Sequence, residues 1–289
     1  MSAALRTEGL GHRYGRRQWG LRDASVEVPP GRIVALIGPN GAGKTTLLLM
    51  AAGLLPPTQG AVEVLGAPPP KRLDRIGFVA QDAPLWPRLR VDDVLEIGRC
   101  MNPRFDAALA QNRVDQFEIP RRSRIATLSG GQRAQVALTL VLAKRPDLLL
   151  LDEPLSNLDP LARRDFLSSM FDACAESGTA VLFSSHVVAE LERICDYLIL
   201  LRHGRVRLVG DIDELRMNHR ILSGPTGWTL GGGDGLISAR SVAGRTTALT
   251  LSASAATAGP GMEEAPPTFD ELVLGYLEED RTTTTGVPA

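Results

Sequence analysis

The chain has 289 residues, of which 44% are hydrophobic and 22% are charged, and its formal net charge is -1. This composition excludes an intrinsically disordered chain, and it disfavours a nucleic-acid binder because no positive excess is available to neutralise phosphates. The apolar runs are far shorter than the roughly 20 residues of a membrane-spanning helix. No signal peptide is expected in the polar stretch 1–11. Three cysteines without a CxxC pattern, Cys100, Cys174 and Cys195, favour a reducing cytoplasm over a disulfide framework or a zinc site.

Three short apolar runs predict strands that are buried on both faces, as in a parallel sheet covered by helices. In chain order they are 32–38 before a glycine-rich turn and a helix at 44–52, 148–151 before Asp152 and Glu153, and 180–183 before Ser184, Ser185 and His186. The runs therefore predict an α/β core.

Helix-spaced apolar residues at 91–100 and 104–117 predict a helical insert between Gln81 and Leu128. A further helix is expected from Ser129 to about Lys144, where Pro146 ends it. The runs 197–201 and 205–209 predict a closing hairpin.

After about Leu215 the pattern weakens, and Gly231, Gly232 and Gly233 precede a stretch rich in Ser, Thr and Ala at 238–258. This part is predicted to be a small β-rich appendage or a partly flexible tail. Capping-box spacing at 268–271 predicts a late helix over about 268–279. The expected division is a domain at 3–218, with its helical subdomain at about 84–145, and an appendage at 219–289.

The most complete motif is G-x-x-x-x-G-K-[ST], formed by Gly38, Pro39, Asn40, Gly41, Ala42, Gly43, Lys44 and Thr45. Its glycines let successive backbone N–H groups converge on phosphate oxygens at the positive end of the following helix. We expect Lys44 to reach the β- and γ-phosphates of a nucleotide and the Thr45 hydroxyl to bind Mg²⁺. Thr46 belongs to the same predicted nucleotide site.

Acidic residues follow the second strand, at the edge where parallel sheets bind ligands. Asp152 is predicted to hold the metal, through water, and Glu153 to polarise an attacking water. A solvated acidic turn is the alternative explanation of these two residues taken alone, but the complete phosphate loop disfavours it.

The sequence LSGGQ opens the helix after the insert. Ser129 and Gln132 have the spacing of an ordinary capping box. Gly130 and Gly131 additionally leave the helix N-terminus open to the close approach of an anion.

With these motifs the chain resembles the nucleotide-binding subunit of an ATP-binding cassette (ABC) transporter over about residues 3–218. LSGGQ resembles the family's signature motif, and it stands upstream of the LLLLDE strand as in the family. The resemblance implies a P-loop ABC-type ATPase that uses ATP and Mg²⁺.

Single residues match further family motifs in the same order along the chain. Gln81 resembles the Q-loop glutamine, which touches the metal and couples to the membrane subunit. Asp159, within Ser156–Asp159, resembles the D-loop aspartate, and His186 the switch histidine that contacts the γ-phosphate. Tyr14 resembles the residue that stacks on adenine, with Trp19 and His12 as nearby alternatives.

The resemblance implies that two cassettes pair head to tail, so that Ser129 and Gly131 of one serve the nucleotide of the other, with Glu153 as general base. The expected partners are a second ATP-binding subunit, identical or different, and an integral membrane permease. No nucleic acid is expected, and the expected location is peripheral, on the cytoplasmic face of the cell membrane.

Two other classes of protein share parts of this motif set. Soluble ABC ATPases that act on DNA or ribosomes are the main alternative, but this chain has one cassette, a short insert and no CxxC. A P-loop kinase or GTPase does not explain LSGGQ. The segment after Gln81 and the late helix resemble drug and antibiotic exporters, so export is expected, with import as the second option. The Gln81 loop and residues 84–98 are the predicted docking surface, with Trp86 or Leu85 as the anchor and burial within the insert expected for at least one of the two.

Overall fold

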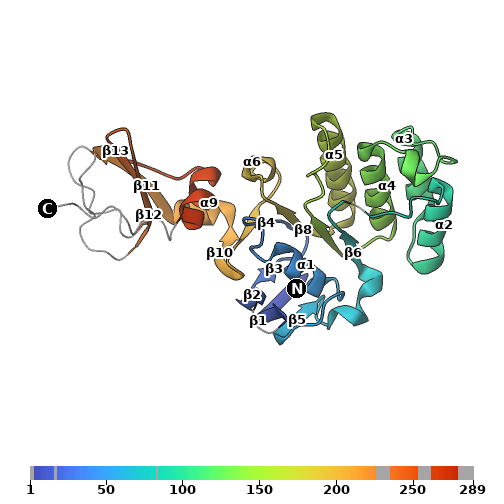
Figure 1. The fold of residues 1–289 in the computed structure, drawn as a ribbon, viewed down its shortest axis with the longest axis horizontal. Coiled ribbons are helices and arrows are strands. Elements are labelled where there is room, and N and C mark those ends of the chain that lie inside the picture. The colour runs from blue at the N-terminus through green and yellow to red at the C-terminus, as the bar shows by residue number, and fades with distance from the viewer. Residues whose placement is uncertain (1–2, 16–17, 83, 226–234, 253–261, 279–289) are drawn as a thin grey trace.

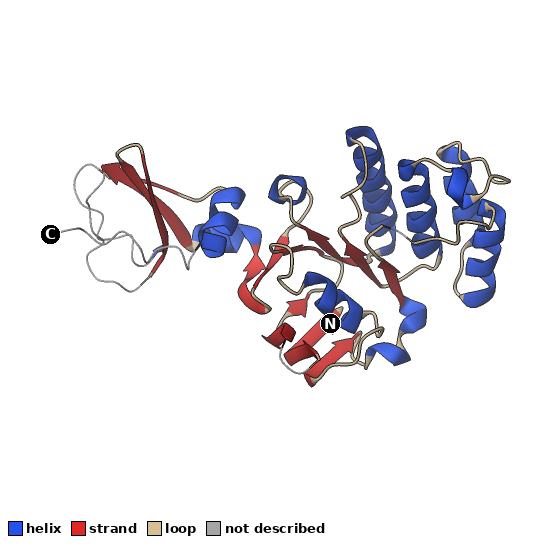
Figure 2. Ribbon diagram, in the orientation of Figure 1, coloured by secondary structure: helices blue, strands red, loops and turns tan. Residues whose placement is uncertain are grey.

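The structure is a computed structural model that describes residues 3–15, 18–82, 84–225, 235–252 and 262–278. Three sheets organise these residues (Figure 2). No helix among them is both long and apolar enough to cross a bilayer. Gly231–Gly233, residues 253–258 of the Ser/Thr/Ala-rich stretch and the last predicted helical position, 279, lie outside the described residues.

A six-stranded sheet forms the centre, in the order β10-β9-β4-β8-β7-β6. Its strands are β4 (Ile33–Ile37), β6 (Ile76–Val79), β7 (Leu148–Asp152), β8 (Ala180–Ser185), β9 (Tyr197–Arg202) and β10 (Arg205–Asp211). All neighbours pair in parallel except β9 and β10, which form the antiparallel hairpin. The three apolar runs that predicted strands buried on both faces form β4, β7 and β8, which lie next to one another in the sheet. The predicted α/β fold class is confirmed.

The register of this sheet brings three motifs to one edge. Asp152 at the end of β7 pairs with Ser184 near the end of β8, and Ser185 pairs with Ile37 at the end of β4. Because the strands are parallel, the residues that follow each of them emerge at the same edge. The phosphate loop, the Asp152–Glu153 pair and His186 therefore converge, although they are far apart in sequence.

The first helix, α1 (Lys44–Ala51), packs between the six-stranded sheet and a second, antiparallel sheet (Figure 1). It consists of β1 (Leu5–Tyr14), β2 (Gln18–Ala24), β3 (Glu27–Val28) and β5 (Gln59–Val64). Leu47 and Leu48 of α1 belong to a core cluster that also contains residues of both sheets. This packing fixes the helix that follows the phosphate loop between two layers.

The helical insert lies at one end of the molecule (Figure 1). The helices there and beside it are α2 (Val91–Met101), α3 (Ala107–Gln116), α4 (Gly130–Ala143) and α5 (Pro160–Ser177). Short 3₁₀ turns occupy Pro69–Lys71, Leu73–Arg75 and Ile125–Thr127. Asp147, just before β7, accepts hydrogen bonds from Arg75 and Arg104, and these guanidinium groups hold the pKa of its carboxyl below the usual range. This ion-pair cluster connects the insert to the central sheet.

The carboxyl-terminal part carries a separate antiparallel sheet at the opposite end (Figure 1). After α6 (Val188–Leu191) and α7 (Ile212–Met217), its elements are β11 (His219–Pro225), β12 (Leu236–Val242), β13 (Arg245–Leu251), β14 (Glu263–Ala265) and α9 (Phe269–Glu278). Phe269 and Leu272 of α9 belong to the same buried cluster as Leu191 of α6 and Leu198 of β9. The sheet is thereby packed onto the core through α9.

Candidate functional site

The phosphate loop runs from the end of β4 to the start of α1, and two of its glycines are required by its shape. Gly41 and Gly43 have φ angles of 79° and 105°, in the left-handed region that favours glycine. A Cβ on Gly43 would also come within 2.5 Å of the Gly20 carbonyl oxygen in β2. The loop therefore keeps its backbone exposed toward the space above the α1 N-terminus.

A pocket of about 480 Å³ opens at this N-terminus. It is lined by Tyr14, Gln18, Trp19, Gly20, Asn40, Gly41, Ala42, Gly43, Lys44, Thr45, Thr46, Gln81, Glu153, Ser156 and His186. Apart from Gly38, Pro39 and Asp152, which do not line the pocket, this set includes every residue that the sequence predicted for the phosphate loop, the metal and the catalytic positions. Five separate segments of the chain supply these residues.

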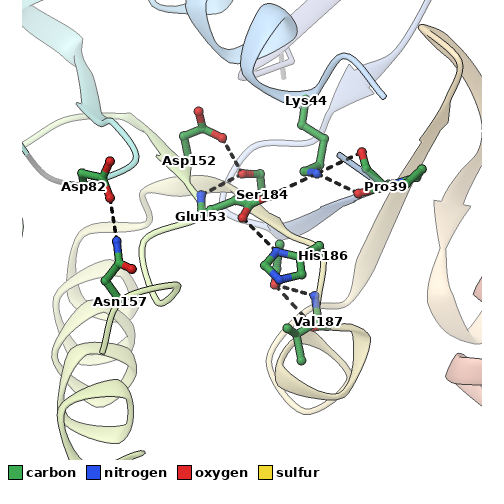
Figure 3. A network of polar contacts seen from close by, with 11 residues as sticks. Pro39, Lys44, Asp82, Asp152, Glu153, Asn157, Ser184, His186 and Val187 are labelled. Atoms are coloured by element: carbon green, nitrogen blue, oxygen red, sulfur yellow. Dashed lines mark hydrogen bonds and ion pairs between the residues drawn. The ribbon is translucent and has the colours of Figure 1, made fainter. Parts of the chain in front are cut away.

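Lys44 is almost completely buried at the centre of this pocket, with 5% of its surface exposed. Its Nζ donates hydrogen bonds to the carbonyl oxygens of Gly38, at 2.7 Å, and Pro39, at 3.4 Å (Figure 3). The same Nζ lies 3.1 Å from Glu153 Oε1. The ammonium is thus held between the loop and the catalytic candidate, where it can neutralise negative charge.

Glu153 is held by contacts on three sides. Its Oε1 meets Lys44, its Oε2 lies 2.8 Å from His186 Nδ1, and its backbone N–H donates to Ser184 Oγ at 2.9 Å (Figure 3). Its φ angle is 44°, a left-handed conformation that costs energy in a residue with a side chain. This backbone turn directs the carboxylate into the pocket instead of along the strand.

Asp152, directly before Glu153 at the end of β7, is buried, with only 2% of its surface exposed. Its Oδ1 accepts a hydrogen bond of 2.8 Å from Ser184 Oγ. Carboxylate, hydroxyl and amide oxygens, here from Asp152, Thr45 and Gln81, are the donors that Mg²⁺ prefers. Among the described residues no group of three or more His, Cys, Asp or Glu side chains could hold a metal ion. The donor set therefore fits a Mg²⁺ that takes most of its ligands from phosphate and water.

Two aromatic residues, Tyr14 and Trp19, also line the pocket. Tyr14 is 44% exposed, its hydroxyl lies 3.3 Å from Thr46 Oγ1, and the His12 ring meets it edge-on. Trp19 lies under the guanidinium groups of Arg13 and Arg22. Because Tyr14 and Trp19 both line the pocket, either ring can face an adenine there, whereas His12 is not among the lining residues.

The signature residues are not brought to this pocket. Ser129 Oγ accepts a hydrogen bond from the Gln132 N–H, and Gln132 Oε1 accepts one from the Ser129 N–H, so the predicted capping box is formed. Gly130 instead lines a neighbouring cavity of about 190 Å³, which shares Ser156 with the pocket. Asp82 and Asn157, joined by a hydrogen bond of 2.6 Å, line the same cavity (Figure 3). The phosphate-loop residues and Gly130 of the signature segment therefore line two different cavities of one chain, which meet at Ser156.

Asp159, predicted to take part in nucleotide binding, also lies outside the pocket. Its Oδ1 accepts hydrogen bonds from the N–H groups of Leu161 and Ala162, each 3.0 Å long, and caps α5.

Sequence reasoning missed two residues and one contact. Ser184 supports both Asp152 and the Glu153 backbone, and its place at the end of a buried strand was the available signal. Asn157 belongs to the predicted segment 156–159, but its contact with Asp82 joins segments 75 positions apart and had no local signal. Gly20 had none either: a Cβ there would lie 2.5 Å from the Tyr14 ring.

Comparison with known proteins decides the family. A sequence model described as "ABC transporter" matches residues 21–156, and a model of an AAA domain from a type IV toxin–antitoxin system matches residues 124–192. The ABC transporter ATP-binding protein YtrB of Bacillus subtilis is 33% identical over 68% of this chain and 68% of its own length. The chain belongs to the ATP-binding proteins of ABC transporters. It is accordingly an ABC ATPase.

Two further proteins show the range of this similarity. The aliphatic sulfonates import ATP-binding protein SsuB 2 of Xanthomonas axonopodis pv. citri is 38% identical over 72% of both chains. A solved ATP-binding subunit of an ABC transporter superposes with a TM-score of 0.67 at 29% identity, over 74% of this chain and 92% of that one. The likeness thus covers about three quarters of the chain.

Proposed function

We propose that this chain hydrolyses MgATP in the pocket around Lys44 and uses the energy to drive transport through a separate membrane permease, on the cytoplasmic face of the membrane. The observation that carries the proposal is the ion pair of Lys44 with Glu153, because it joins the phosphate loop to the catalytic candidate. The names of the relatives, as ATP-binding proteins of transporters, support the coupling to transport.

In this proposal the nucleotide phosphates compete with Glu153 for the Lys44 ammonium. Once Lys44 turns to the β- and γ-phosphates, one oxygen of Glu153 is free to accept a proton from the attacking water. His186, held 2.8 Å from the other oxygen, then orients the carboxylate and reaches the γ-phosphate. Ion pairing would thus restrain the base until the substrate is bound.

A bound Mg²⁺ would neutralise charge on the phosphates. Thr45, which is exposed to the pocket, would bind it directly. Asp152 is nearly buried and would act through water, while Gln81 approaches from the loop after β6.

Two cassettes are needed to complete the site in this proposal. The signature segment lies apart from the nucleotide pocket of its own chain, and its helix N-terminus offers N–H groups without intrahelical partners. Head-to-tail pairing, with a second copy or a related subunit, would bring Ser129, Gly130 and Gly131 of one cassette to the phosphates of the other. Asp159 would then act at the interface between the two.

The permease is proposed to dock in a groove of about 880 Å³ between the core and the helical insert. Four exposed apolar side chains line this groove, namely Leu54, Leu73, Trp86 and Met101. Leu85, the other anchor expected from the sequence, is partly buried against the insert. An apolar helix segment from a cytoplasmic loop of the permease fits such a surface.

Substitution of Trp86 tests the docking proposal. Trp86→Glu places a charge in the groove at a side chain that is 54% exposed, so the fold and basal ATPase should be retained. Recovery of the permease from detergent-solubilised native membranes should fall at least tenfold, about 1.4 kcal/mol. Val242→Glu on β12, where the side chain is 56% exposed, is the matched control and should leave recovery unchanged. Equal recovery with both variants would refute docking at this groove.

The direction of transport is a finer question. Sequence features after Gln81 and in the late helix favour export, whereas the relative SsuB 2 is named for import. Uptake and efflux assays in inverted vesicles containing the recovered permease separate the two directions. ATP-driven accumulation inside inverted vesicles supports export, and ATP-driven loss from them supports import.

A further inference from the structure

Arg113 is a buried cation that the proposed chemistry does not use. It lies on α3 and is 8% exposed. Its guanidinium donates to Thr139 Oγ1 at 3.3 Å and Gln135 Oε1 at 3.3 Å, both on α4, and to the Ser169 carbonyl oxygen at 3.4 Å on α5. One side chain therefore joins three helices.

All three acceptors are neutral. Among the described residues Arg113 forms no ion pair with a carboxylate, and burial lowers its pKa to about 10, against the more distant charge of Asp172, which raises it. The Gln135 Nε2 beside it is buried without a hydrogen-bond partner in the described part of the chain. An apolar side chain would pack here without leaving a charge unpaired, so this polar cluster is a poor source of stability. Its directional bonds instead fix how α3, α4 and α5 are aligned.

The N-termini of α4 and α5, the two helices that Arg113 joins to α3, carry the residues predicted to face a second cassette. We call these residues, 129–132 and 157–159, the signature surface. Ser129 caps α4, and Asp159 caps α5. Near these ends the helices approach closely, since a Cβ on Gly131 would lie 3.0 Å from the Ala162 Cβ, and Ala134 of α4 and Phe166 of α5 belong to one buried cluster. These apolar contacts are not directional, so they do less than hydrogen bonds to fix the relative rotation or slide of the helices.

We propose that Arg113 is a positioning residue that fixes α4 against α5, so that the signature glycines and the Asn157 segment meet the partner cassette's nucleotide as one surface. The inference rests on the proposed two-cassette function. It assigns the effect of Arg113 to the nucleotide site of the partner rather than to the site of its own chain.

Mixing of variants tests this assignment, because it separates effects in cis from effects in trans. Arg113→Met should retain ATP binding at its own intact pocket but lose at least tenfold in ATPase rate, with kcat rather than KM affected. Lys44→Ala supplies an intact signature surface and a defective pocket. In mixed pairs of these two variants, one nucleotide site has both halves intact, so the mixture should exceed the activity of either variant alone.

Three controls make the result interpretable. Lys44→Ala mixed with Glu153→Gln should gain nothing, because both changes affect the pocket of their own chain. Lys44→Ala mixed with Gly130→Asp should gain activity, because Gly130 belongs to the signature surface. Val114→Ala, the fully buried neighbour of Arg113, should lower the thermal midpoint without a comparable loss of kcat.

The outcomes distinguish the inference from the proposed function. Gain in the Arg113→Met mixture, comparable to that with Gly130→Asp, supports the inference. Gain with Gly130→Asp but none with Arg113→Met overturns it, and gain with neither overturns the two-cassette site as well. If Arg113→Met does not fold, Arg113→Lys replaces it, because one ammonium cannot reproduce the guanidinium's bonds to both helices. Wild-type protein without ATPase activity would refute the proposed function itself.

Discussion

The nucleotide pocket and the signature surface are built by opposite means. The pocket relies on charged side chains held by one another, with Lys44, Glu153 and His186 in a continuous row. On the signature surface, Ser129 and Gln132 are hydrogen-bonded to each other, which leaves backbone N–H groups and glycines to face outward. The charged side chains of the pocket and the backbone N–H groups of the signature surface can both bind phosphate oxygens, but within one chain they line different cavities.

This difference explains how substitutions should act. Changes in the pocket remove groups that the proposed function places against the chain's own nucleotide, so they should affect binding or chemistry in cis. Changes on the signature surface should leave nucleotide binding by the single chain intact and impair turnover only when two cassettes meet.

Lys44→Ala should have the largest effect. It removes the one ammonium in the phosphate loop and leaves the nearly buried Glu153 carboxylate without its ion pair. ATP binding, measured with a fluorescent analogue, should be lost, and turnover should fall at least about 10³-fold. Lys71→Ala, at an exposed lysine outside the pocket, is the control and should change neither. Near-normal ATPase activity of Lys44→Ala would contradict the proposal that this pocket binds and hydrolyses ATP.

Glu153→Gln should separate binding from chemistry within the pocket. The amide keeps the shape of the side chain but cannot act as a base, so turnover should fall about 10²–10⁴-fold while ATP binding is retained. Single-turnover hydrolysis measures the chemical step directly. An unchanged single-turnover rate would exclude Glu153 as the base.

Gly130→Asp should affect the signature surface alone. A Cβ at Gly130 has room, with the Asn157 carbonyl oxygen 3.6 Å away, and an acidic residue in the first turn suits the helix dipole. The thermal midpoint and ATP binding should therefore be unchanged. Repulsion of the partner's phosphates should lower turnover about 10²-fold. Loss of ATP binding by the isolated variant would contradict the separation of the two halves.

Substitution of His219, which lies in β11 outside the pocket and the signature surface, should have the smallest effect, and this effect should be on stability. Burial lowers the pKa of His219, opposed by its hydrogen bond to the Leu215 carbonyl, and its Nε2 meets the Tyr276 hydroxyl at 2.9 Å. Because the folded pKa is depressed, the unfolded chain binds more protons below pH about 6.5, and stability should fall as the pH drops through the folded pKa.

The measurement for His219 is the thermal midpoint of unfolding of the whole protein at pH 7.5 and 5.5. The midpoint should fall on the order of 2–4 °C more in wild type than in His219→Gln, whose side chain does not titrate. ATP binding at either pH should be equal in the two proteins. An identical pH response would exclude His219 as the titrating group.

The sequence allowed the residues of the pocket to be grouped together because they belong to contiguous motifs at strand ends. Lys44 follows a glycine turn, and Asp152 and Glu153 end a buried strand, so the parallel sheet alone brings them together. Ser129 and Gln132 were equally readable as a capping box. These features depend on spacings of a few residues.

Other features depend on contacts that no local pattern encodes. The left-handed turn at Glu153, the contact of Asn157 with Asp82 and the bonds from Arg113 to two other helices all result from tertiary packing. The packing of α9 against α6 is of the same kind. Asp159 fits its motif in sequence, yet the observed role of its side chain within one chain is to cap α5.

The central claim is that the two halves of the site meet only between cassettes. Sedimentation velocity of Glu153→Gln with and without MgATP tests it most directly, because slow hydrolysis should trap the paired state. The account predicts a monomer without nucleotide and a dimer with ATP, and it predicts that Gly130→Asp in the same background abolishes this dimer. A Glu153→Gln protein that binds ATP but stays monomeric, alone and with its recovered membrane partner, would contradict the account.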